Sequence, residues 1–263
     1  MHELVSLLGA GWVMSVMLLS VRIATLLLLT PILYAVSMPM TVRALVILGI
    51  ACVLALPFSA AGVVPLHDVG GLMQAVMREA AIGATLGLGV LVAFAGFMLA
   101  GQLIDVQAGF GMAQVFDPAT RTRVPIVSAT FGLLAAVFFF VVDGHHALLR
   151  GLAYSVERFP VGQGWEGASA AAPLVRQVTG LFTLGFALAA PVVLGLLLVE
   201  FALGVLSRNL PQMNALVLGL PVKIIVALFA LAAWATGFAA PAARLYAGIY
   251  EAWAAWFAAG ATR

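Results

Sequence analysis

The strongest candidate for a catalytic cluster is a short polar run in the middle of the chain, Asp143-Gly144-His145-His146. Histidine and aspartate are common ligands of a catalytic zinc ion, and histidine is a frequent general acid and base. Adjacent histidines on a helix point about 100° apart. No H-E-x-x-H motif and no second carboxylate-rich segment supplies further ligands. We therefore expect a polar turn at the end of an apolar helix and no metal site.

The other common catalytic signatures are missing from the sequence. It contains no G-x-S-x-G nucleophile motif and no phosphate-binding loop with its lysine. The single cysteine, Cys52, excludes a disulfide within the chain. We expect a protein that is not an enzyme and that holds no cofactor.

The segment from residue 101 to 118 combines a polar helix end with glycines and bulky apolar side chains. Its candidate functional residues are Gly109, Phe110, Gly111, Met112, Phe116, Asp117 and Pro118. Glycine lets the backbone bend, and phenylalanine and methionine offer bulky, deformable apolar surface. An irregular apolar loop at membrane depth survives only inside protein or along a cavity. The residue types alone allow two interpretations, a gasket in a pore or a re-entrant turn.

A third polar segment lies between residues 200 and 223. Glu200 and Arg208 are eight residues apart, so they lie on similar faces of a helix, where charges inside a membrane protein tend to find partners. Pro211 then ends the helix, and the polar side chains after it can bond the freed backbone groups. We expect a structural bend that also docks another subunit. The candidate interface residues are Glu200, Arg208, Pro211, Gln212, Asn214 and Lys223.

The amino-acid composition indicates the class of protein to which these candidate residues belong. Of 263 residues, 64% are apolar, and 12 basic plus 10 acidic residues make only 22 charges. A soluble domain of this length, at about 25% charged, carries roughly 65. So few charges cannot cover a water-exposed surface, which excludes a soluble enzyme, a disordered chain and a nucleic-acid-binding protein. We expect an integral membrane protein.

Long apolar stretches separate the charged residues. They run over Leu4–Val21, Ile23–Val42, Ala44–Leu66, Ala80–Ile104, Val124–Val142, Gln177–Val199 and Ile224–Ala243. Each is long enough to cross about 30 Å of hydrocarbon as a helix. The alternating segments of a transmembrane barrel are missing, so we predict an all-α fold. The first stretch lacks the positive leader of a cleaved signal peptide, and we expect it to be retained.

The apolar stretches in the first third of the chain follow one another almost without interruption. Single arginines, Arg22 and Arg43, are all that separate the first three stretches, which leaves little room for loops. Pro31, Pro39 and Pro57 also fall here, and a proline inside a helix removes a hydrogen bond and bends the rod. We expect broken or hairpin-like helices that lie against protein.

Small residues are dense after residue 82. Gly83 and Gly87 stand four residues apart and share a helix face. Small residues let a second helix approach closely in a membrane, so we expect tight helix packing here.

Several motifs together resemble the FliR family of flagellar biosynthetic proteins and its SctT homologues in virulence-associated type III secretion. The matching pieces are Gly109-Phe110-Gly111-Met112-Ala113 with Phe116-Asp117-Pro118, Asp143-Gly144-His145-His146 followed by Leu148-Leu149, Ser207-Arg208 with Pro211-Gln212-Met213-Asn214, and Gly219-Leu220-Pro221-Val222-Lys223. Together with their apolar surroundings, the order and spacing of these pieces cover nearly the whole chain, and the Pro-Gln-Met-Asn piece is the most specific.

The resemblance implies an architecture and a function. FliR-like proteins form the export gate of the type III secretion apparatus with FliP and FliQ. The implied fold is one membrane-embedded domain over residues 1–263, with a FliP-like part at about 1–175 and a FliQ-like helical hairpin at about 176–263. Its bent helices pack against neighbouring subunits around a central channel.

The resemblance also gives the candidate loop a role. The family segment matching residues 106–122 resembles a plug that helps to close the channel, which favours the gasket over the re-entrant turn. We expect Phe110, Met112 and Phe116 to carry this role. Side chains that meet in a narrow pore exclude water and ions, and they yield when an unfolded substrate passes.

Partners and location follow from the same resemblance. It implies FlhA-like and FlhB-like partners, unfolded flagellar proteins as substrates, and a place in the bacterial inner membrane within the flagellar basal body. The alternative is the equivalent SctT export-gate subunit of a virulence injectisome. Two other hypotheses are an intramembrane metalloenzyme centred on Asp143, His145 and His146, and a small-solute transporter.

Overall fold

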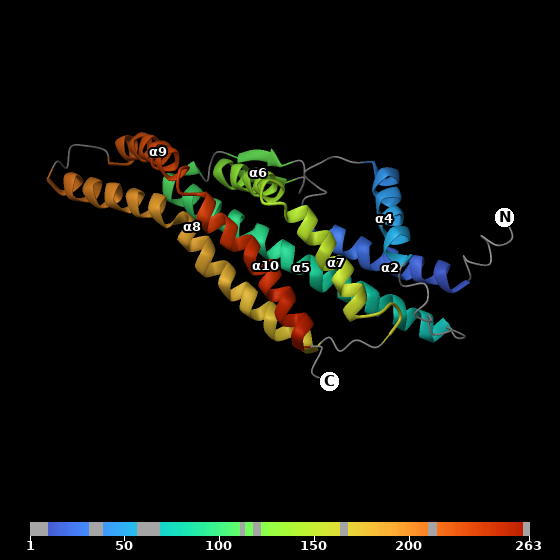
Figure 1. Ribbon diagram of the computed structural model, residues 1–263. Helices are drawn as coiled ribbons and strands as arrows, with labels where there is room; N and C mark the ends of the chain where they lie inside the picture. The colour runs from blue at the N-terminus through green and yellow to red at the C-terminus, as the bar shows by residue number, and fades with distance from the viewer. Residues whose placement is uncertain are drawn as a thin grey trace. The chain divides into compact units, whose positions relative to one another are not determined.

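The computed structural model of the protein describes residues 10–31, 39–56, 69–110, 114–117, 122–163, 168–209 and 215–259. Within these ranges the chain forms eight α-helices and one β-hairpin (Figure 1). The helices are α2 (Ala10–Leu29), α4 (Met40–Ala55), α5 (Val69–Ala108), α6 (Ile126–Val141), α7 (Gly144–Arg158), α8 (Ala168–Asn209), α9 (Ala215–Trp234) and α10 (Ala239–Ala259). Strands β1 (Gln114–Asp117) and β2 (Thr122–Pro125) pair between α5 and α6.

Several helices have the length and apolar composition of membrane-spanning helices. Three of the described helices, α2, α5 and α8, are long and apolar enough to cross it. The pairs α6–α7 and α9–α10 are each bent at a break of no more than four residues. The predicted all-α membrane fold with bent helices is therefore confirmed, and the small hairpin is an addition that the sequence pattern did not predict.

The charges and prolines of the first third occupy positions that the apolar stretches did not predict. Arg22 lies in the middle of α2 and Arg43 in the first turn of α4, so neither arginine marks a loop. Two prolines lie outside the helices instead, because Pro31 follows α2 and Pro39 is the N-cap of α4. Pro57 lies outside the described residues.

The chain divides into two compact units. Unit 1 comprises Met1–Leu91, Asp143–Gln177 and Ile249–Arg263, and unit 2 comprises Val92–Val142 and Val178–Gly248. Three of the four boundaries fall inside α5, α8 and α10, so these helices contribute to both units, and the fourth lies between α6 and α7. The division into FliP-like and FliQ-like parts near residue 175 partitions the chain differently, and it stays a prediction.

A buried ion pair lies at the centre of unit 1. Arg22 Nε lies 2.6 Å from Glu79 Oε2, and the two side chains are 0% and 2% exposed. The other guanidinium nitrogens donate to the backbone oxygens of Ser155, at 3.0 Å, and Phe159, at 2.9 Å. The second carboxylate oxygen accepts a hydrogen bond from the backbone nitrogen of Gly162 at 3.1 Å. The network thereby joins α2, α5, α7 and the turn after α7.

Close packing of α2 on α5 confirms the expectation for the small residues. A Cβ atom on Gly83 would collide with the backbone oxygen of Arg22. A Cβ atom on Gly87 would lie 2.8 Å from Leu29 Cβ and 2.9 Å from the backbone oxygen of Leu26. The two glycines therefore allow the approach that brings Arg22 to Glu79.

Unit 2 has an aromatic core around Tyr246 of α10. The ring centroid of Tyr246 lies 5.4 Å from that of Phe97 on α5 and 5.6 Å from that of Phe139 on α6. The tyrosine hydroxyl donates a 2.6 Å hydrogen bond to the backbone oxygen of Ala135. Phe238, in the break between α9 and α10, extends the cluster with its own contact to Phe97.

We expect Arg22→Met to lower the free energy of unfolding by about 3–5 kcal/mol, because Glu79 is then buried without a partner charge. Denaturant unfolding in mild detergent, followed by helical circular dichroism, measures this loss. Adding Glu79→Gln restores part of the stability, since no uncompensated charge remains. Arg176→Met removes an exposed arginine and is the matched control. Equal stability of Arg22→Met and the control would show that the pair does not hold the unit together.

Candidate functional site at the loop between α5 and α6

The candidate loop begins where α5 ends. Gly109 follows α5 with a φ of +84°, in the left-handed region that favours glycine. A Cβ atom there would lie 2.7 Å from Leu220 Cδ2 of α9. Glycine therefore serves both the bend that ends α5 and the close approach of α9.

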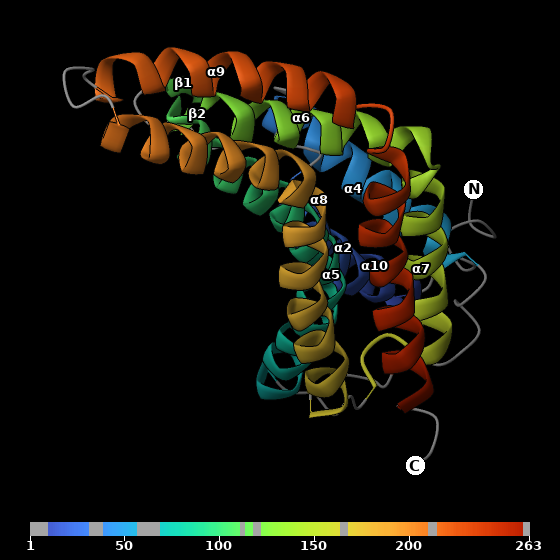
Figure 2. The same cartoon turned by 90° about the vertical axis from the view of Figure 1, so that its left-hand side faces the viewer.

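Phe110 lines an apolar cavity of about 460 Å³ in unit 2. Figure 2 shows α9 alongside α6, and both helices contribute to the walls. The other lining residues are Ile126, Val127, Thr130, Phe131 and Leu134 from α6, with Leu228, Leu231, Trp234, Ala235 and Phe238. The first aromatic residue of the candidate loop thus lies against a cavity whose lining is almost wholly apolar.

The hairpin continues the loop beyond Phe110. In the antiparallel register Gln114 lies opposite Pro125 and Asp117 opposite Thr122. Phe116 and Asp117 are therefore strand residues, placed here by their backbone alone. Gly111, Met112 and Pro118 lie outside the described residues.

Asp105 anchors the base of this loop. Its carboxylate, 1% exposed, accepts hydrogen bonds from the backbone nitrogens of Val127, at 3.0 Å, and Ser128, at 2.8 Å. The Ser128 hydroxyl donates a further 2.6 Å bond to it. Pro125, the N-cap of α6, offers no side-chain cap, so Asp105 satisfies the first turn of α6 from another helix. Its negative charge also suits a helix N-terminus.

The helices are in direct contact at this anchor. A Cβ atom on Gly101 would lie 2.6 Å from Ser128 Cα, so the end of α5 presses against the start of α6. The end of α5 and the start of α6 are therefore held together at Asp105, and the loop residues lie between these two helix ends. The residue pattern indicates only a polar end of α5 and not this role of Asp105, because the hydrogen-bond partners of Asp105 are 22 and 23 residues away.

The second candidate segment contains an ion pair between helices. Lys223 Nζ of α9 lies 3.1 Å from Glu200 Oε1 of α8. Arg208, two turns beyond Glu200, is exposed. Pro211, Gln212 and Asn214 lie outside the described residues. The role of this segment in docking a subunit stays a prediction. Glu200 has an ion-pair partner within the chain, Lys223, which the sequence did not indicate.

Comparison with known proteins decides the family. The chain matches the family described as Bacterial export proteins, family 1, over residues 13–248. It belongs to this family. The match extends from α2 to α10 and includes the candidate loop, the Asp105 anchor and the Glu200–Lys223 pair. The resemblance drawn from the sequence motifs is therefore confirmed at the level of the family.

Individual relatives of this export protein carry two kinds of name. It is 36% identical over 157 residues to "Flagellar biosynthetic protein FliR" of Bacillus subtilis, which covers 59% of this chain and 61% of the relative. It is 31% identical over 215 residues to the protein of that name in Escherichia coli, covering 81% and 80%. "Surface presentation of antigens protein SpaR" of Shigella sonnei is 30% identical over 154 residues, 59% of each chain.

The polar run at the start of α7 is more compact in this export protein than helical spacing suggested. Asp143 is the N-cap of α7 with a φ of 55°, and its Oδ1 lies 3.3 Å from His146 Nδ1. The ring centroids of His145 and His146 are only 4.1 Å apart, contrary to the expected divergence. Donor atoms of all three residues lie within 4.8 Å of one another. The predicted polar turn after the apolar helix α6 is confirmed, and the expectation of no metal stays a prediction.

We expect Asp105→Ala to loosen the loop of this export protein, because two buried backbone nitrogens of α6 lose their acceptor. Arg121 and Arg123 lie between the two anchored ends, so trypsin cleavage there reports the change. Cleavage becomes at least several-fold faster in detergent-solubilised Asp105→Ala, at a cost of about 1–3 kcal/mol in local stability. Gln102→Ala, an exposed position on the same helix, is the control. An unchanged rate in Asp105→Ala would contradict the anchoring role.

Proposed function

We propose that this protein is a subunit of a flagellar protein-export gate, in which the segment 106–122 closes the export channel as a gasket. The family is one of bacterial export proteins, and two relatives are named as flagellar biosynthetic proteins. The observation that carries the proposal is the loop itself. It has a base held by Asp105 and begins with an aromatic residue beside an apolar cavity.

A gasket needs these two properties together. Its base must stay in place while a substrate passes, and buried hydrogen bonds to a helix N-terminus supply that restraint. Its closing surface must be apolar and deformable to exclude water and ions, which suits Phe110, Met112 and Phe116. No covalent step is required, so the proposed gate works without enzymatic chemistry or a cofactor.

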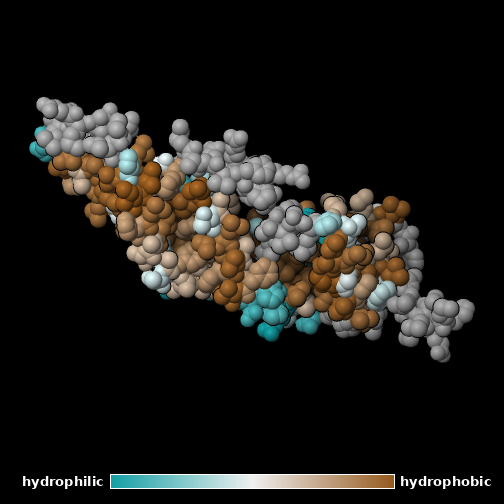
Figure 3. Space-filling view, turned by 90° about the horizontal axis from the view of Figure 1, so that it is seen from above, coloured by the Kyte–Doolittle hydropathy of each residue, from teal (hydrophilic) through white to brown (hydrophobic). Residues whose placement is uncertain are grey.

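The surface supports assembly with other membrane subunits. Hydrophobic side chains make up most of the coloured surface in the view of Figure 3. Large side chains that are at least 60% exposed occur on α6, α8 and α9: Leu133, Val137, Val141, Val175, Leu194, Leu198, Phe201 and Phe229. Exposed apolar surface of this extent needs lipid or neighbouring subunits to cover it.

The proposed partners are FliP-like and FliQ-like subunits, with FlhA-like and FlhB-like proteins beside the gate. In this assembly, residues from 1 to about 175 form the FliP-like part and residues from about 176 to 263 the FliQ-like hairpin. The substrates are unfolded flagellar proteins, and the gate lies in the bacterial inner membrane within the flagellar basal body. Arg208 is exposed on the apolar helix α8, which suits an acidic group on a neighbouring subunit.

The second candidate is the equivalent gate subunit of a virulence injectisome. Its support is the similarity to SpaR of Shigella sonnei, at 30% identity. A strain that lacks this protein separates the candidates. Loss of flagella favours the first, and intact flagella with lost secretion of virulence effectors favours the second.

We expect the triple variant Phe110→Ala, Met112→Ala, Phe116→Ala to leak ions, because small side chains leave a gap in the closed pore. Potassium efflux from cells that express the variant rises, while the purified complex keeps its subunits. Phe186→Ala removes an exposed phenylalanine on α8 and is the matched control. Unchanged efflux in a fully assembled triple variant would exclude the gasket.

We expect the tagged protein, isolated in mild detergent, to bring FliP-like and FliQ-like subunits with it in one large complex. Arg208→Glu strongly reduces their recovery, since like charges then meet among packed helices. Arg176→Glu makes the same charge reversal at an exposed residue of α8 and leaves recovery normal. Mass spectrometry of the co-purified proteins measures both effects. Wild-type protein that purifies alone would refute the assembly, and normal recovery with Arg208→Glu would refute only the role of Arg208.

A further inference from the structure

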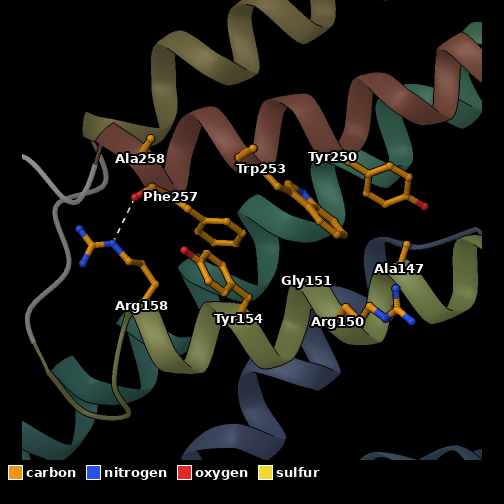
Figure 4. Close-up of a pocket in the computed structure, with 10 residues that line it drawn as sticks. Ala147, Arg150, Gly151, Tyr154, Arg158, Tyr250, Trp253, Phe257 and Ala258 are labelled. Atoms are coloured by element: carbon orange, nitrogen blue, oxygen red, sulfur yellow. Dashed lines mark hydrogen bonds between the residues drawn. The ribbon is translucent and has the colours of Figure 1, made fainter.

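A groove of about 750 Å³ lies between α7 and α10 in unit 1 (Figure 4). Four of its ten lining residues are aromatic. Tyr154 from α7 faces Phe257 from α10 at a ring-centroid distance of 5.2 Å. Trp253 forms the floor, because its ring lies where a Cβ atom on Gly151 would be. The groove therefore depends on glycine at residue 151.

Helix α7 has the character of a helix at a membrane surface. It carries charged residues, and its buried face holds Leu148, Leu152 and Val156, each at most 7% exposed. The opposite face exposes Arg150 and Tyr154. Amphipathic helices with arginine and aromatic residues lie at the level of the lipid headgroups. We place the groove at this level, where phosphate groups and acyl chains are both within reach.

Charge at the two ends of the groove is positive. Arg158 lies at one end, and its Nε donates a 3.1 Å hydrogen bond to the backbone oxygen of Phe257. Arg150 lies at the other end, eight residues or about 12 Å along the helix. It makes no hydrogen bond or ion pair with the part of the chain that the structure describes. None of the described residues that line the groove carries a carboxylate, and the acid at the start of α7, Asp143, is paired with His146.

A second polar group at the Arg150 end also lacks a partner. The Tyr250 hydroxyl oxygen is buried, and no acceptor or donor for it occurs among the described residues. Figure 4 shows this hydroxyl and the Arg150 guanidinium at the same end of the groove, from facing helices. A buried polar group without a partner is costly, and phosphate oxygens are acceptors for both kinds of donor.

We propose that the groove binds an anionic phospholipid, with its phosphate at Arg150 and the Tyr250 hydroxyl and an acyl chain along the aromatic wall. A free phosphate ion would leave Tyr154 and Phe257 uncovered, and an uncharged lipid would leave Arg150 unpaired. Basic sites between membrane helices are suited to anionic headgroups. The proposal uses residues of unit 1 only and does not depend on the export function.

Native mass spectrometry of the full-length protein in mild detergent tests the lipid. Phosphatidylglycerol and phosphatidylcholine with identical acyl chains are added in equal amounts. We expect more bound phosphatidylglycerol, and Arg150→Gln weakens its binding about fivefold, as loss of one arginine contact with an anionic lipid predicts. Arg176→Gln removes the same charge from an exposed position outside the groove and leaves binding unchanged.

Ala254→Leu tests the acyl-chain part of the site, because this exposed alanine lines the groove and a larger side chain fills it without changing charge. We expect it to reduce phosphatidylglycerol binding as well. Equal weakening by Arg150→Gln and Arg176→Gln, or full displacement of the lipid by inorganic phosphate, would overturn the proposal. So would an Ala254→Leu variant that binds lipid normally but loses co-purifying proteins, since a protein partner then covers the groove.

Discussion

One buried guanidinium determines how the helices of unit 1 pair. Arg22 is fully buried in α2, and its nitrogens bond groups from α5, α7 and the turn beyond α7. Lipid is as apolar as the helix surfaces, so burial alone does not select one pairing of apolar helices over another. A charge inside the bundle does select, because a shifted helix would leave it unpaired at high cost. The small residues Gly83 and Gly87 are the necessary complement, since they let α2 come close enough for the pair to form.

Unit 2 uses the same principle with neutral and acidic groups. Asp105, Tyr246 and Trp234 each bond backbone groups on a different helix. Each of these bonds fixes the position of one helix along its neighbour, which apolar packing leaves adjustable. The consequence is greatest at Asp105, because its bonds also determine where the chain leaves α5 and where it enters α6. The loop between them is therefore held at both ends by a single carboxylate.

These restraints are consistent with the proposed export gate, in which the base of the loop stays in place and apolar surfaces contact other subunits. The polar networks lie inside the units, where they resist rearrangement, and large apolar side chains occupy the outer faces of α6, α8 and α9. Such faces suit contacts with other membrane subunits and with lipid. The candidate gasket combines a polar network with apolar surface, since its base is held by Asp105 and its first aromatic residue is Phe110. The α7–α10 groove differs from the outer faces, since it offers unpaired polar donors as well as apolar surface.

The sequence by itself determined the class of protein, the all-α membrane fold, the family and the place of the candidate loop. Composition, the length of apolar stretches and local motifs are sufficient for these, because each depends on average environment or on residues close together in the chain. Only the tertiary structure placed Arg22 inside a helix, joined Asp105 to α6, brought the rings of His145 and His146 together and paired Glu200 with Lys223. Most of these contacts join segments tens of residues apart. They depend on how the helices are positioned against one another, and the ring contact depends on side-chain torsions, neither of which hydropathy or spacing encodes.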